Sequence, residues 1–347
     1  MAKDYYVVPI FVPHQGCPHD CVFCNQKRIS GVDRQLKSEE IRYEIDSILS
    51  TLDYDHNPRV EIAFFGGSFT GIDVPLQEMY LAIGYDYVQR GLVDALRLST
   101  RPDYIDDEIL KRLKRYGVAV VELGVQSMHD DVLVASNRGH SRMDVLRACN
   151  LIKSYGFTLG VQLMPGLPDD SVSRFKETVD QVLEIAPDII RLYPTLVIRD
   201  TALALDYEAG LYQPMSLEDA VQACAYGLER FLERGIDVIR IGLQPTEAVS
   251  ESGDVLAGPF HPSFRQLVEG ELFRRRLMHE IEAMEDMDLA NLKGKKLNIR
   301  CRENQISSVS GLNKRNKEAL LKKYGFSNIK IIGVKAMMPY TIVIEVF

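Results

Sequence analysis

The feature of this chain that most restricts its fold is an alternation of short apolar runs with longer segments of helical spacing. Seven runs rich in Val, Ile, Leu and aromatic residues have the length of strands: Tyr5–Pro13, Val60–Gly66, Ala95–Thr100, Val118–Gln126, Phe157–Met164, Ile189–Val197 and Val238–Gln244. Helical patterns occupy Glu39–Leu49, Leu76–Arg90, Asp107–Arg115, Met143–Lys153, Val172–Leu183 and Leu217–Leu232. Strands alternating with helices form right-handed βαβ units, so the pattern predicts an α/β protein with a parallel sheet.

The first apolar run leads directly into a polar loop that holds three cysteines. Cys17, Cys21 and Cys24 have the spacing C-x3-C-x2-C. Because Pro and Gly let a loop curl without helical or strand restraints, the three thiolates can converge on one inorganic centre. Soft thiolate ligands favour zinc, copper(I) or an iron–sulfur cluster.

The residues alone leave the identity of this centre open. A structural zinc site needs four ligands and could take its fourth from His14 or His19. A disulfide is less attractive, since the odd local count leaves one thiol over and the chain shows no secretory context. A [4Fe–4S] cluster on three cysteines would leave one iron open for a ligand, and open metal positions usually serve chemistry.

Six or seven βα units fit a full or partial barrel of the TIM type, and we expect a partial (βα)6-type TIM-like barrel. In such folds the active site lies at the carboxyl ends of the strands. Polar or glycine-rich motifs do follow five of the predicted strands: Gly66-Gly67, Ser99–Asp103, the group Glu122, Gly124 and Gln126, Met164–Pro168, and the pair Arg191 and Tyr193. Each motif alone is equally compatible with a tight turn. Together with the cysteine loop, they indicate one shared site.

Composition and charge divide the chain into regions. No apolar run approaches a membrane span, and the N-terminus has no cleavable signal, so we expect a cytoplasmic protein without membrane contact. Cys149 and Cys224 lie in helical patterns and should be buried thiols. The net charge of −8 divides into +9 for residues 293–347 and −17 for the rest. This contrast predicts three regions: a core at 1–245, a helical extension at 246–290 and a small basic α/β domain at 291–347.

The basic tail is a candidate RNA-binding region. It reads as a strand at Lys295–Cys301, a helix at Lys314–Tyr324 and strands at Ile329–Lys335 and Tyr340–Phe347. Basic residues bracket the first strand and cover the helix, as a surface for phosphate contacts would. A solvated basic face without a ligand is the alternative, and the charge contrast favours RNA.

The cysteine spacing, with Phe23 before the last cysteine, resembles the signature of radical S-adenosylmethionine (radical SAM) enzymes. The motifs TRPDY, ELGVQS, NRGH and YPTLVIR extend the likeness over residues 5–205 to the Elp3 branch, the catalytic subunit family of Elongator. Members of that branch modify the wobble uridine of tRNA and carry a C-terminal acetyltransferase domain. This chain departs from the pattern after Arg240, so the resemblance does not carry over an acetyl-CoA-dependent reaction.

The resemblance implies a set of cofactor-binding residues. Cys17, Cys21 and Cys24 would hold a [4Fe–4S] cluster whose open iron binds S-adenosyl-L-methionine (SAM). The glycine pair Gly66 and Gly67 would receive the SAM amino group, with Ser68 standing where the family often has Glu.

Further contacts follow from the same resemblance. Thr100 and Arg101 would contact the ribose or the carboxylate of SAM, and a guanidinium fork suits a carboxylate. Gln126 would be a polar contact at the end of the fourth strand. Phe23 would pack against adenine or, nearly as well, anchor the loop as a core aromatic.

Two further motifs are candidates for the substrate side. His140 and Arg138 of NRGH could serve as a general acid/base and an anion clamp, with helix capping around Gly139 as an equal alternative. His261 and Arg265 could close over the active site and touch an anionic substrate. Pro262 suits the first turn of a capped helix, which is the plainer interpretation.

The leading hypothesis is therefore a radical SAM enzyme. A reducing partner such as flavodoxin or ferredoxin would supply the electron, and a 5′-deoxyadenosyl radical would abstract hydrogen from the substrate. That substrate would be a tRNA base or a small anionic metabolite such as a tetrapyrrole. The rival is a non-catalytic nucleic-acid-binding protein with a Cys3His zinc site.

Overall fold

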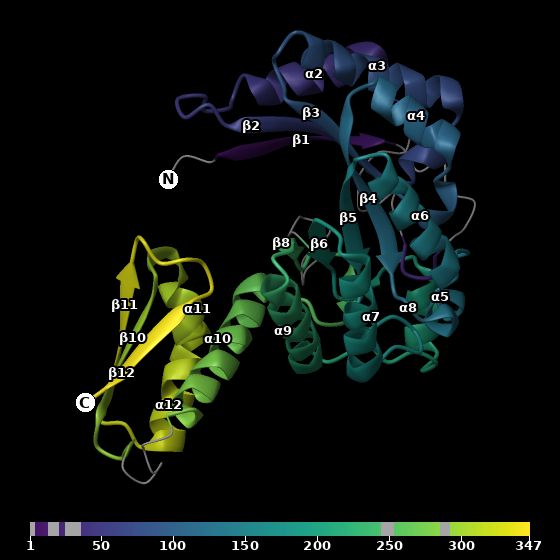
Figure 1. Cartoon of the computed structure of the whole chain (residues 1–347). Coiled ribbons are helices and arrows are strands. Elements are labelled where there is room, and N and C mark those ends of the chain that lie inside the picture. Colours follow the sequence, from purple (N-terminus) through teal and green to yellow (C-terminus); the bar gives the residue numbers. More distant parts are fainter. Residues whose placement is uncertain (1–3, 13–20, 25–35, 244–252, 285–291) are drawn as a thin grey trace.

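Seven parallel strands form the main sheet and curve into a half-barrel (Figure 1). In this computed structural model, residues 4–12, 21–24, 36–243, 253–284 and 292–347 are described. The strand order is β1-β2-β3-β4-β5-β6-β8. The bounds are β1 (Tyr5–Val12), β2 (Arg59–Gly66), β3 (Ala95–Thr100), β4 (Val118–Gln126), β5 (Thr158–Leu163), β6 (Ile189–Leu192) and β8 (Asp237–Ile241). The predicted α/β fold with a partial TIM-like barrel is confirmed.

Helices between the strands pack on the outer side of the sheet. They are α2 (Ser38–Leu49), α3 (Val74–Gln89), α4 (Asp107–Arg115), α6 (Arg142–Ser154), α7 (Val172–Ile185) and α9 (Leu217–Glu233), each within two residues of its predicted bounds. Local capping explains several of these starts. Ser141, Ser171 and Ser216 each accept a hydrogen bond from the backbone N–H three residues later.

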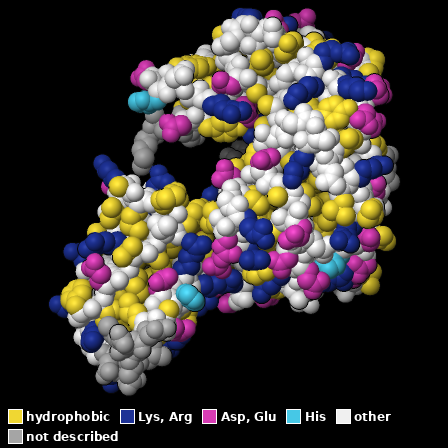
Figure 2. All heavy atoms as spheres, in the orientation of Figure 1, with side chains coloured by type: hydrophobic (Ala, Val, Ile, Leu, Met, Phe, Trp, Pro, Cys, Tyr) yellow, Lys and Arg dark blue, Asp and Glu magenta, His cyan; other side chains and the backbone are white. Residues whose placement is uncertain are grey.

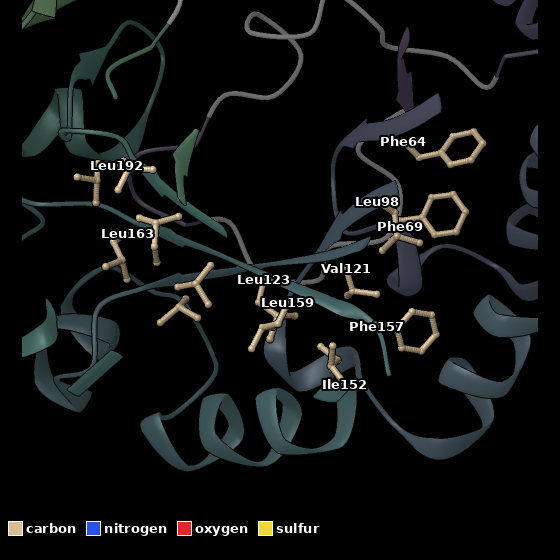
Figure 3. Packing of buried hydrophobic residues seen from close by; sticks show 14 of the residues in the cluster. Phe64, Phe69, Leu98, Val121, Leu123, Ile152, Phe157, Leu159, Leu163 and Leu192 are labelled. Carbon is tan, nitrogen blue, oxygen red and sulfur yellow. The ribbon is translucent and has the colours of Figure 1, made fainter. Parts of the chain in front are cut away.

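The two faces of the main sheet differ in chemistry, because successive side chains on a strand point to opposite sides. Leu98, Leu123 and Leu159 lie on the outer face and pack against the helices in a continuous apolar core (Figure 3). The alternate positions, on the inner face, include charged residues such as Arg97 and Glu122, which are also buried. The inner face of the half-barrel is therefore a polar wall.

Some elements were not predicted, and one predicted strand is divided. The run Ile189–Val197 forms β6 and a separate short strand, β7 (Val197–Ile198), which pairs with β9 (Val255–Ala257). Pro194, which has no N–H for a ladder, lies between the two strands. The short helices α5 (Asp130–Ala135) and α8 (Ala202–Glu208) carry weak periodicity and were missed.

The basic tail folds as a small mixed sheet against helices. Its elements are β10 (Lys296–Arg302), α11 (Ile306–Ser310), α12 (Arg315–Tyr324), β11 (Asn328–Val334) and β12 (Ile342–Val346). The central strand β10 is parallel to β11 and antiparallel to β12. The predicted strand, helix and two further strands are thus present.

One helix belongs to both apolar cores. The first part of α10 (Phe264–Glu282) contributes Val268 and Leu272 to the core of the half-barrel. Its later part contributes Phe273, Leu277 and Ile281 to the core of the small domain. In the described part of the chain, no helix has the length and apolarity needed to cross a membrane.

Candidate functional site

The described part of the cysteine loop, Cys21 to Cys24, is a tight turn held from two sides. The N–H of Cys24 donates to the carbonyl of Cys21 at 2.9 Å. The N–H of Val22 donates to the Ser136 carbonyl at 3.2 Å, and the Val22 carbonyl accepts from the N–H of Leu203 at 2.7 Å. These bonds attach the turn to the loop after α5 and to the start of α8. Cys17 lies outside the described residues, as do His14 and His19.

Phe23 anchors this turn. Its ring and Val22 pack against a small apolar cluster formed by β7, α8 and β9, with Val197, Leu203, Ala204, Tyr212, Leu256 and Ala257 as members. This is the anchoring role that the sequence left open beside an adenine contact. The packing fixes the direction in which Cys21 and Cys24 leave the turn.

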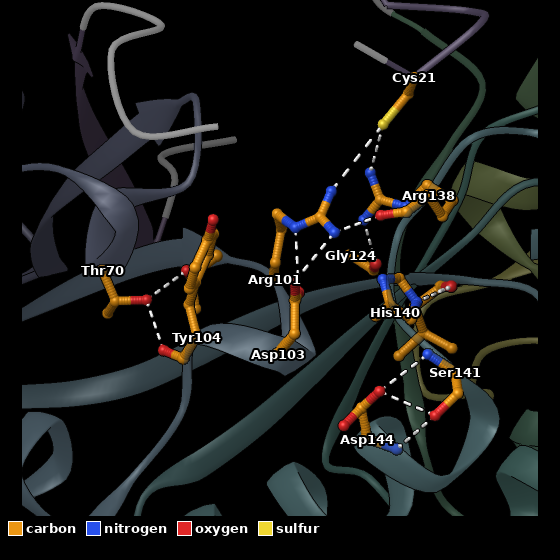
Figure 4. A network of polar contacts seen from close by, with 12 residues as sticks. Cys21, Thr70, Arg101, Asp103, Tyr104, Gly124, Arg138, His140, Ser141 and Asp144 are labelled. Carbon is orange, nitrogen blue, oxygen red and sulfur yellow. Dashed lines mark hydrogen bonds and ion pairs between the residues drawn. The ribbon is translucent and has the colours of Figure 1, made fainter. Parts of the chain in front are cut away.

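Two arginines converge on the sulfur of Cys21 (Figure 4). Arg138 donates from Nη1 to Cys21 Sγ at 3.3 Å, and Arg101 approaches the same sulfur with Nη1 at 4.0 Å. Cys21 is only 4% exposed. Guanidinium groups at these positions can donate hydrogen bonds to a metal-ligating thiolate.

A chain of hydrogen bonds holds these arginines in place. Arg138 donates from Nη2 to the Gly124 carbonyl at 2.6 Å, and its own carbonyl accepts from Arg101 Nη2. A Cβ at Gly124 would lie 3.1 Å from Arg138 Nη2 and 3.0 Å from the amide nitrogen of Gln126. The absent side chain at Gly124 therefore lets the Arg138 guanidinium lie over β4.

The fork of Arg101 is already engaged. Its Nε and Nη2 each contact one carboxylate oxygen of Asp103 at 3.0 Å. This edge, which the resemblance assigns to the SAM carboxylate, holds Asp103 in the structure, and the SAM contact of Arg101 stays a prediction. Arg101 thus faces the cysteine turn with Nη1 alone.

Thr100 is part of a hydroxyl chain next to Arg101. Thr70 Oγ1 donates its single proton to the Tyr104 carbonyl at 2.7 Å, so the Thr100 hydroxyl donates to Thr70 Oγ1. Thr100 is buried, and its remaining lone pairs are acceptors only. This orientation suits a donor such as a ribose hydroxyl.

Gly66 lies where β2 meets the start of the cysteine loop. In the sheet register Gly66 is opposite Val12, the last described residue before the loop. Its φ is +112°, and a Cβ there would lie 2.5 Å from the Val12 carbonyl oxygen. Only glycine fits this position. Gly67 is partly exposed, and Ser68 is buried.

Gln126 lies at an irregularity of β4. The register between β4 and β5 shifts between Gly124 and Gln126, and Gln126 has a φ of +70°. Its side-chain oxygen accepts a hydrogen bond from Gln162 Nε2 at 3.2 Å. The bulge turns this buried amide toward the neighbouring strand, at the same edge as Arg138.

His140 is buried below the arginines and is only 5% exposed. Its Nε2 bonds the Val125 carbonyl at 3.2 Å; a carbonyl only accepts, so Nε2 carries the proton. Among the described residues, Nδ1 has no partner. Burial, reinforced by Arg138, lowers the His140 pKa to about 3, so near pH 7 the ring is neutral and is not the imidazolium that would serve as a general acid. The cap of the following helix is Ser141, with Asp144 completing a capping box.

His261 follows β9, which pairs with β7 in the part of the fold against which Phe23 packs. It lines a small pocket with Pro194 and Gly242, which follow β6 and β8, the strands farthest from β1 in the sheet order. His261 Nδ1 accepts from the Ser263 N–H at 3.0 Å. Arg265 pairs with Glu269 at 2.9 Å and donates to the Tyr340 hydroxyl at 3.2 Å, so it joins α10 to the small domain.

The polar wall contains a buried ion network whose full extent the sequence did not indicate. Arg97 donates to Glu122 from Nε at 3.0 Å and from Nη2 at 2.6 Å, and it also contacts Glu61 at 3.2 Å. Arg191 pairs with the same Glu122 from the other side. Burial alone would raise the Glu122 pKa, but Arg191 and Arg97 hold it below its ordinary value. Charged residues at alternate positions of otherwise apolar strands were the available signal.

The residues present fit a thiolate-bound iron–sulfur cluster. Cys21 and Cys24 supply soft ligands on one turn, and Arg138 and Arg101 supply positive charge beside them. Within the described ranges, no three His, Cys, Asp or Glu side chains gather as a complete metal site, and the third cysteine of the motif lies outside those ranges. The single cysteines Cys149 and Cys224 are buried, and burial raises both of their pKa values.

Comparisons with known proteins agree with this geometry. The profile of the Radical SAM superfamily matches residues 11–182, and that of the Radical_SAM C-terminal domain matches residues 187–274. The chain is 26% identical to the tRNA uridine(34) acetyltransferase of Methanocaldococcus infernus, over 63% of this chain and 48% of that protein. It is 30% identical to Elongator complex protein 3 of Bos taurus, over 65% and 49%. The chain spans about half the length of the curated relatives it matches.

Solved structures show the same fold. The archaeal Elp3 of Methanocaldococcus infernus superposes with a TM-score of 0.61 at 21% identity, covering 81% of this chain and 64% of that one. HydG, a maturase of the [FeFe]-hydrogenase, superposes with a TM-score of 0.53 at 15% identity, covering 77% and 55%.

Proposed function

Because the chain belongs to the radical SAM superfamily and is an enzyme related to Elp3, we propose that it modifies a base of tRNA. In this proposal Cys17, Cys21 and Cys24 hold a [4Fe–4S] cluster, and SAM binds beside it at the carboxyl edge of the sheet. The observation that carries the reaction class is the convergence of Arg138 and Arg101 on the buried sulfur of Cys21. The tRNA substrate is supported by the names of the relatives and by the basic small domain.

When bound, the cluster and SAM would supply one-electron cleavage of SAM and a 5′-deoxyadenosyl radical, with flavodoxin or ferredoxin as the class of reductant. The chain's own residues would position the cluster and SAM and shield them from solvent. Ser136 and Leu203 fix the cysteine turn, and the two arginines balance negative charge at its sulfur. Thr100 and Gly66 line the adjoining strand ends, where hydroxyl acceptors and an exposed backbone suit a ribose and an amino group.

The polar wall favours an uncharged substrate over an anionic one. Arg97 and Arg191 both point into the half-barrel side of the sheet, and both are paired with Glu122. Glu61 also pairs with Arg97, so two arginines face two glutamates and this buried group carries no net charge. A nucleobase suits such a wall better than the carboxylates of a metabolite such as a tetrapyrrole.

The first test concerns the cofactors. Protein purified without oxygen should contain iron and sulfide in similar amounts and should release 5′-deoxyadenosine from SAM with dithionite. Cys21→Ala should lose both properties, whereas Cys149→Ala, which removes a buried thiol in α6, should keep both. About one zinc and no sulfide per chain would refute the proposal.

Arg138→Gln tests whether Arg138 sets the reduction potential of the cluster without being needed to bind it. We expect iron to remain, while the reduction midpoint of the cluster, followed by electron paramagnetic resonance, becomes more negative because a positive charge beside the sulfur is lost. Arg147→Gln, on the exposed side of α6, is the control.

The tRNA substrate is tested separately by comparing nucleosides of bulk tRNA before and after incubation with the enzyme and SAM; unchanged nucleosides would refute it.

A further inference from the structure

The sheet of the small domain has one covered face and one open face. Leu297, Ile299 and Ile329 point toward α10 and α12 and are buried with the apolar side chains of those helices. The alternate residues of the three strands point the other way. Figure 1 shows the helices of this domain on one side of the sheet only, and no helix of the described residues covers the opposite side.

Most charged side chains on the open face are basic, and Ile332, Val334 and Val343 lie among them. Lys296, Arg300 and Arg302 occupy alternate positions of the central strand β10, and Lys330 lies on β11 opposite Asn298. The single acidic residue on this face is Glu345, on β12. Lys and Arg side chains accordingly line the left edge of the small domain in Figure 2, where its sheet lies.

Most of this charge is not neutralised within the protein. Arg300 pairs with Glu345 at 3.2 Å. No ion pair joins Lys296, Arg302 or Lys330 to any described residue, and the side chains of Lys296 and Lys330 are exposed to solvent. These three side chains carry an unbalanced positive charge into solvent.

The helical side of the same domain differs. Two basic residues of α12 already have acidic partners there, with Arg315 at 3.8 Å from Glu218 and Lys323 at 2.7 Å from Glu282. From the sequence alone, the basic strand and the basic helix are equivalent candidates for RNA contact. The structure distinguishes them in part: Arg315 and Lys323 pair with acidic residues of other elements, whereas Lys314, Lys317 and Lys322 form no ion pair with a described residue.

We propose that the open face, defined by Lys296, Arg300, Arg302 and Lys330, binds the phosphate backbone of the RNA substrate; this rests on the proposed action on tRNA. From Lys296 to Arg302 the strand extends about 20 Å, a length over which one strand of a duplex presents roughly six phosphates. The row of cations is therefore long enough for several contacts. Contacts of this face with phosphates depend on the charge and shape of the RNA, whereas recognition of the base would take place in the half-barrel.

The test compares two triple variants of the full-length, cluster-containing enzyme with the same change in charge. One removes the unpaired cations of the open face, as Lys296→Gln, Arg302→Gln and Lys330→Gln. The other changes the helical side, as Lys314→Gln, Lys317→Gln and Lys322→Gln. Binding of fluorescent bulk tRNA is measured by anisotropy over a series of KCl concentrations.

We expect the open-face variant to bind at least roughly 10-fold more weakly near 0.1 M salt, with a salt-dependence slope smaller by about 2 to 3. The helical-side variant should stay within about twofold of the parent. Lys330→Gln alone should reduce the slope by about 1. All variants should keep the parent's thermal midpoint and its release of 5′-deoxyadenosine, because the changed residues lie outside the half-barrel.

Equal losses in both triple variants, or an open-face variant that binds like the parent, would overturn this inference while leaving tRNA as the substrate. A parent enzyme that neither binds nor alters tRNA would overturn the proposed function as well. Stronger binding to phosphatidylserine-containing vesicles than to tRNA, lost in the open-face variant, would assign the face to a membrane surface and also overturn the inference.

Discussion

Gly66 determines how closely β2 can approach the start of the cysteine loop. Gly66→Ala would place a methyl group 2.5 Å from the Val12 carbonyl oxygen, at a φ of +112°. We expect a loss of about 1 to 3 kcal/mol in the free energy of unfolding, together with lower iron content, because β1 must shift to relieve the clash. Denaturant unfolding and iron analysis measure both effects.

The matched control is Gly91→Ala. Gly91 also has a positive φ, +67°, but nothing lies within 4 Å of its Cβ position. Gly91→Ala has the same kind of backbone strain as Gly66→Ala but no steric clash. We therefore expect its free energy of unfolding to fall by about 1 kcal/mol and its iron content to stay unchanged. Equal losses of stability and iron in the two variants would remove the argument from the Val12 contact.

His140 gives the protein a specific sensitivity to acid. Its folded pKa is about 3, well below the usual value of 6.5. Between these values the unfolded chain binds a proton that the folded protein does not bind, so stability rises with pH across this window. The wild type should therefore lose stability relative to His140→Gln as pH falls from 6.5 toward 4, by up to roughly 1.4 kcal/mol per pH unit.

Denaturant unfolding of the wild type and His140→Gln at several pH values measures this difference. His56→Gln, in an exposed loop, should give a curve parallel to the wild type. A constant difference between the wild type and His140→Gln across the window would contradict the assignment of a neutral, buried ring.

At the scale of the elements, Glu122 joins three strands of the polar wall. Glu122→Gln leaves the buried guanidinium of Arg97 and the largely buried one of Arg191 without their shared carboxylate. We expect a loss of about 3 to 5 kcal/mol in the free energy of unfolding, because breaking a buried ion pair leaves a buried charge without its partner. Glu108→Gln removes an exposed carboxylate paired with Lys111 and should leave the unfolding midpoint unchanged. Similar midpoints for the two variants would contradict a cohesive role for the network.

The sequence predicted the regular elements well for local reasons. Helices α4 and α7 begin at the predicted residues because Asp106 and Ser171 cap them. Continuous apolar runs marked the buried parallel strands, and the rule that βαβ units are right-handed led to the half-barrel. The division of β6 from β7 was missed, although Pro194 lay between them as a signal.

The site was less predictable, because its decisive contacts are not local. Cys21 and Arg138 are separated by 117 positions, and no spacing rule brings them together. The engagement of Arg101 by Asp103, two residues later, was visible in principle as a local ion pair. Several roles stay predictions: those toward SAM of Phe23, Gly66, Gly67, Thr100, Arg101 and Gln126, those toward the substrate of Arg138, His140 and His261, and ligation of a cluster by Cys17, Cys21 and Cys24.

For the whole molecule, α10 couples two cores through one helix. Leu277→Ala opens a cavity in the core of the small domain, whereas Leu272→Ala opens one in the core of the half-barrel. Each should cost about 2 to 5 kcal/mol locally. Hydrogen exchange should rise in β10 to β12 for the first variant and in β8 and α9 for the second. Equal increases in both regions for both variants would show that the two cores unfold as a single unit.

The shared helix also has a consequence for how the enzyme would choose its target. The 19 residues of α10 form a rod about 28 Å long, which cannot shorten or twist without breaking its own hydrogen bonds. This helix therefore holds the small domain, with its proposed phosphate contacts, at a fixed distance from the half-barrel. Such an enzyme would select its nucleotide partly by its distance, along a folded RNA, from the phosphates that the small domain contacts.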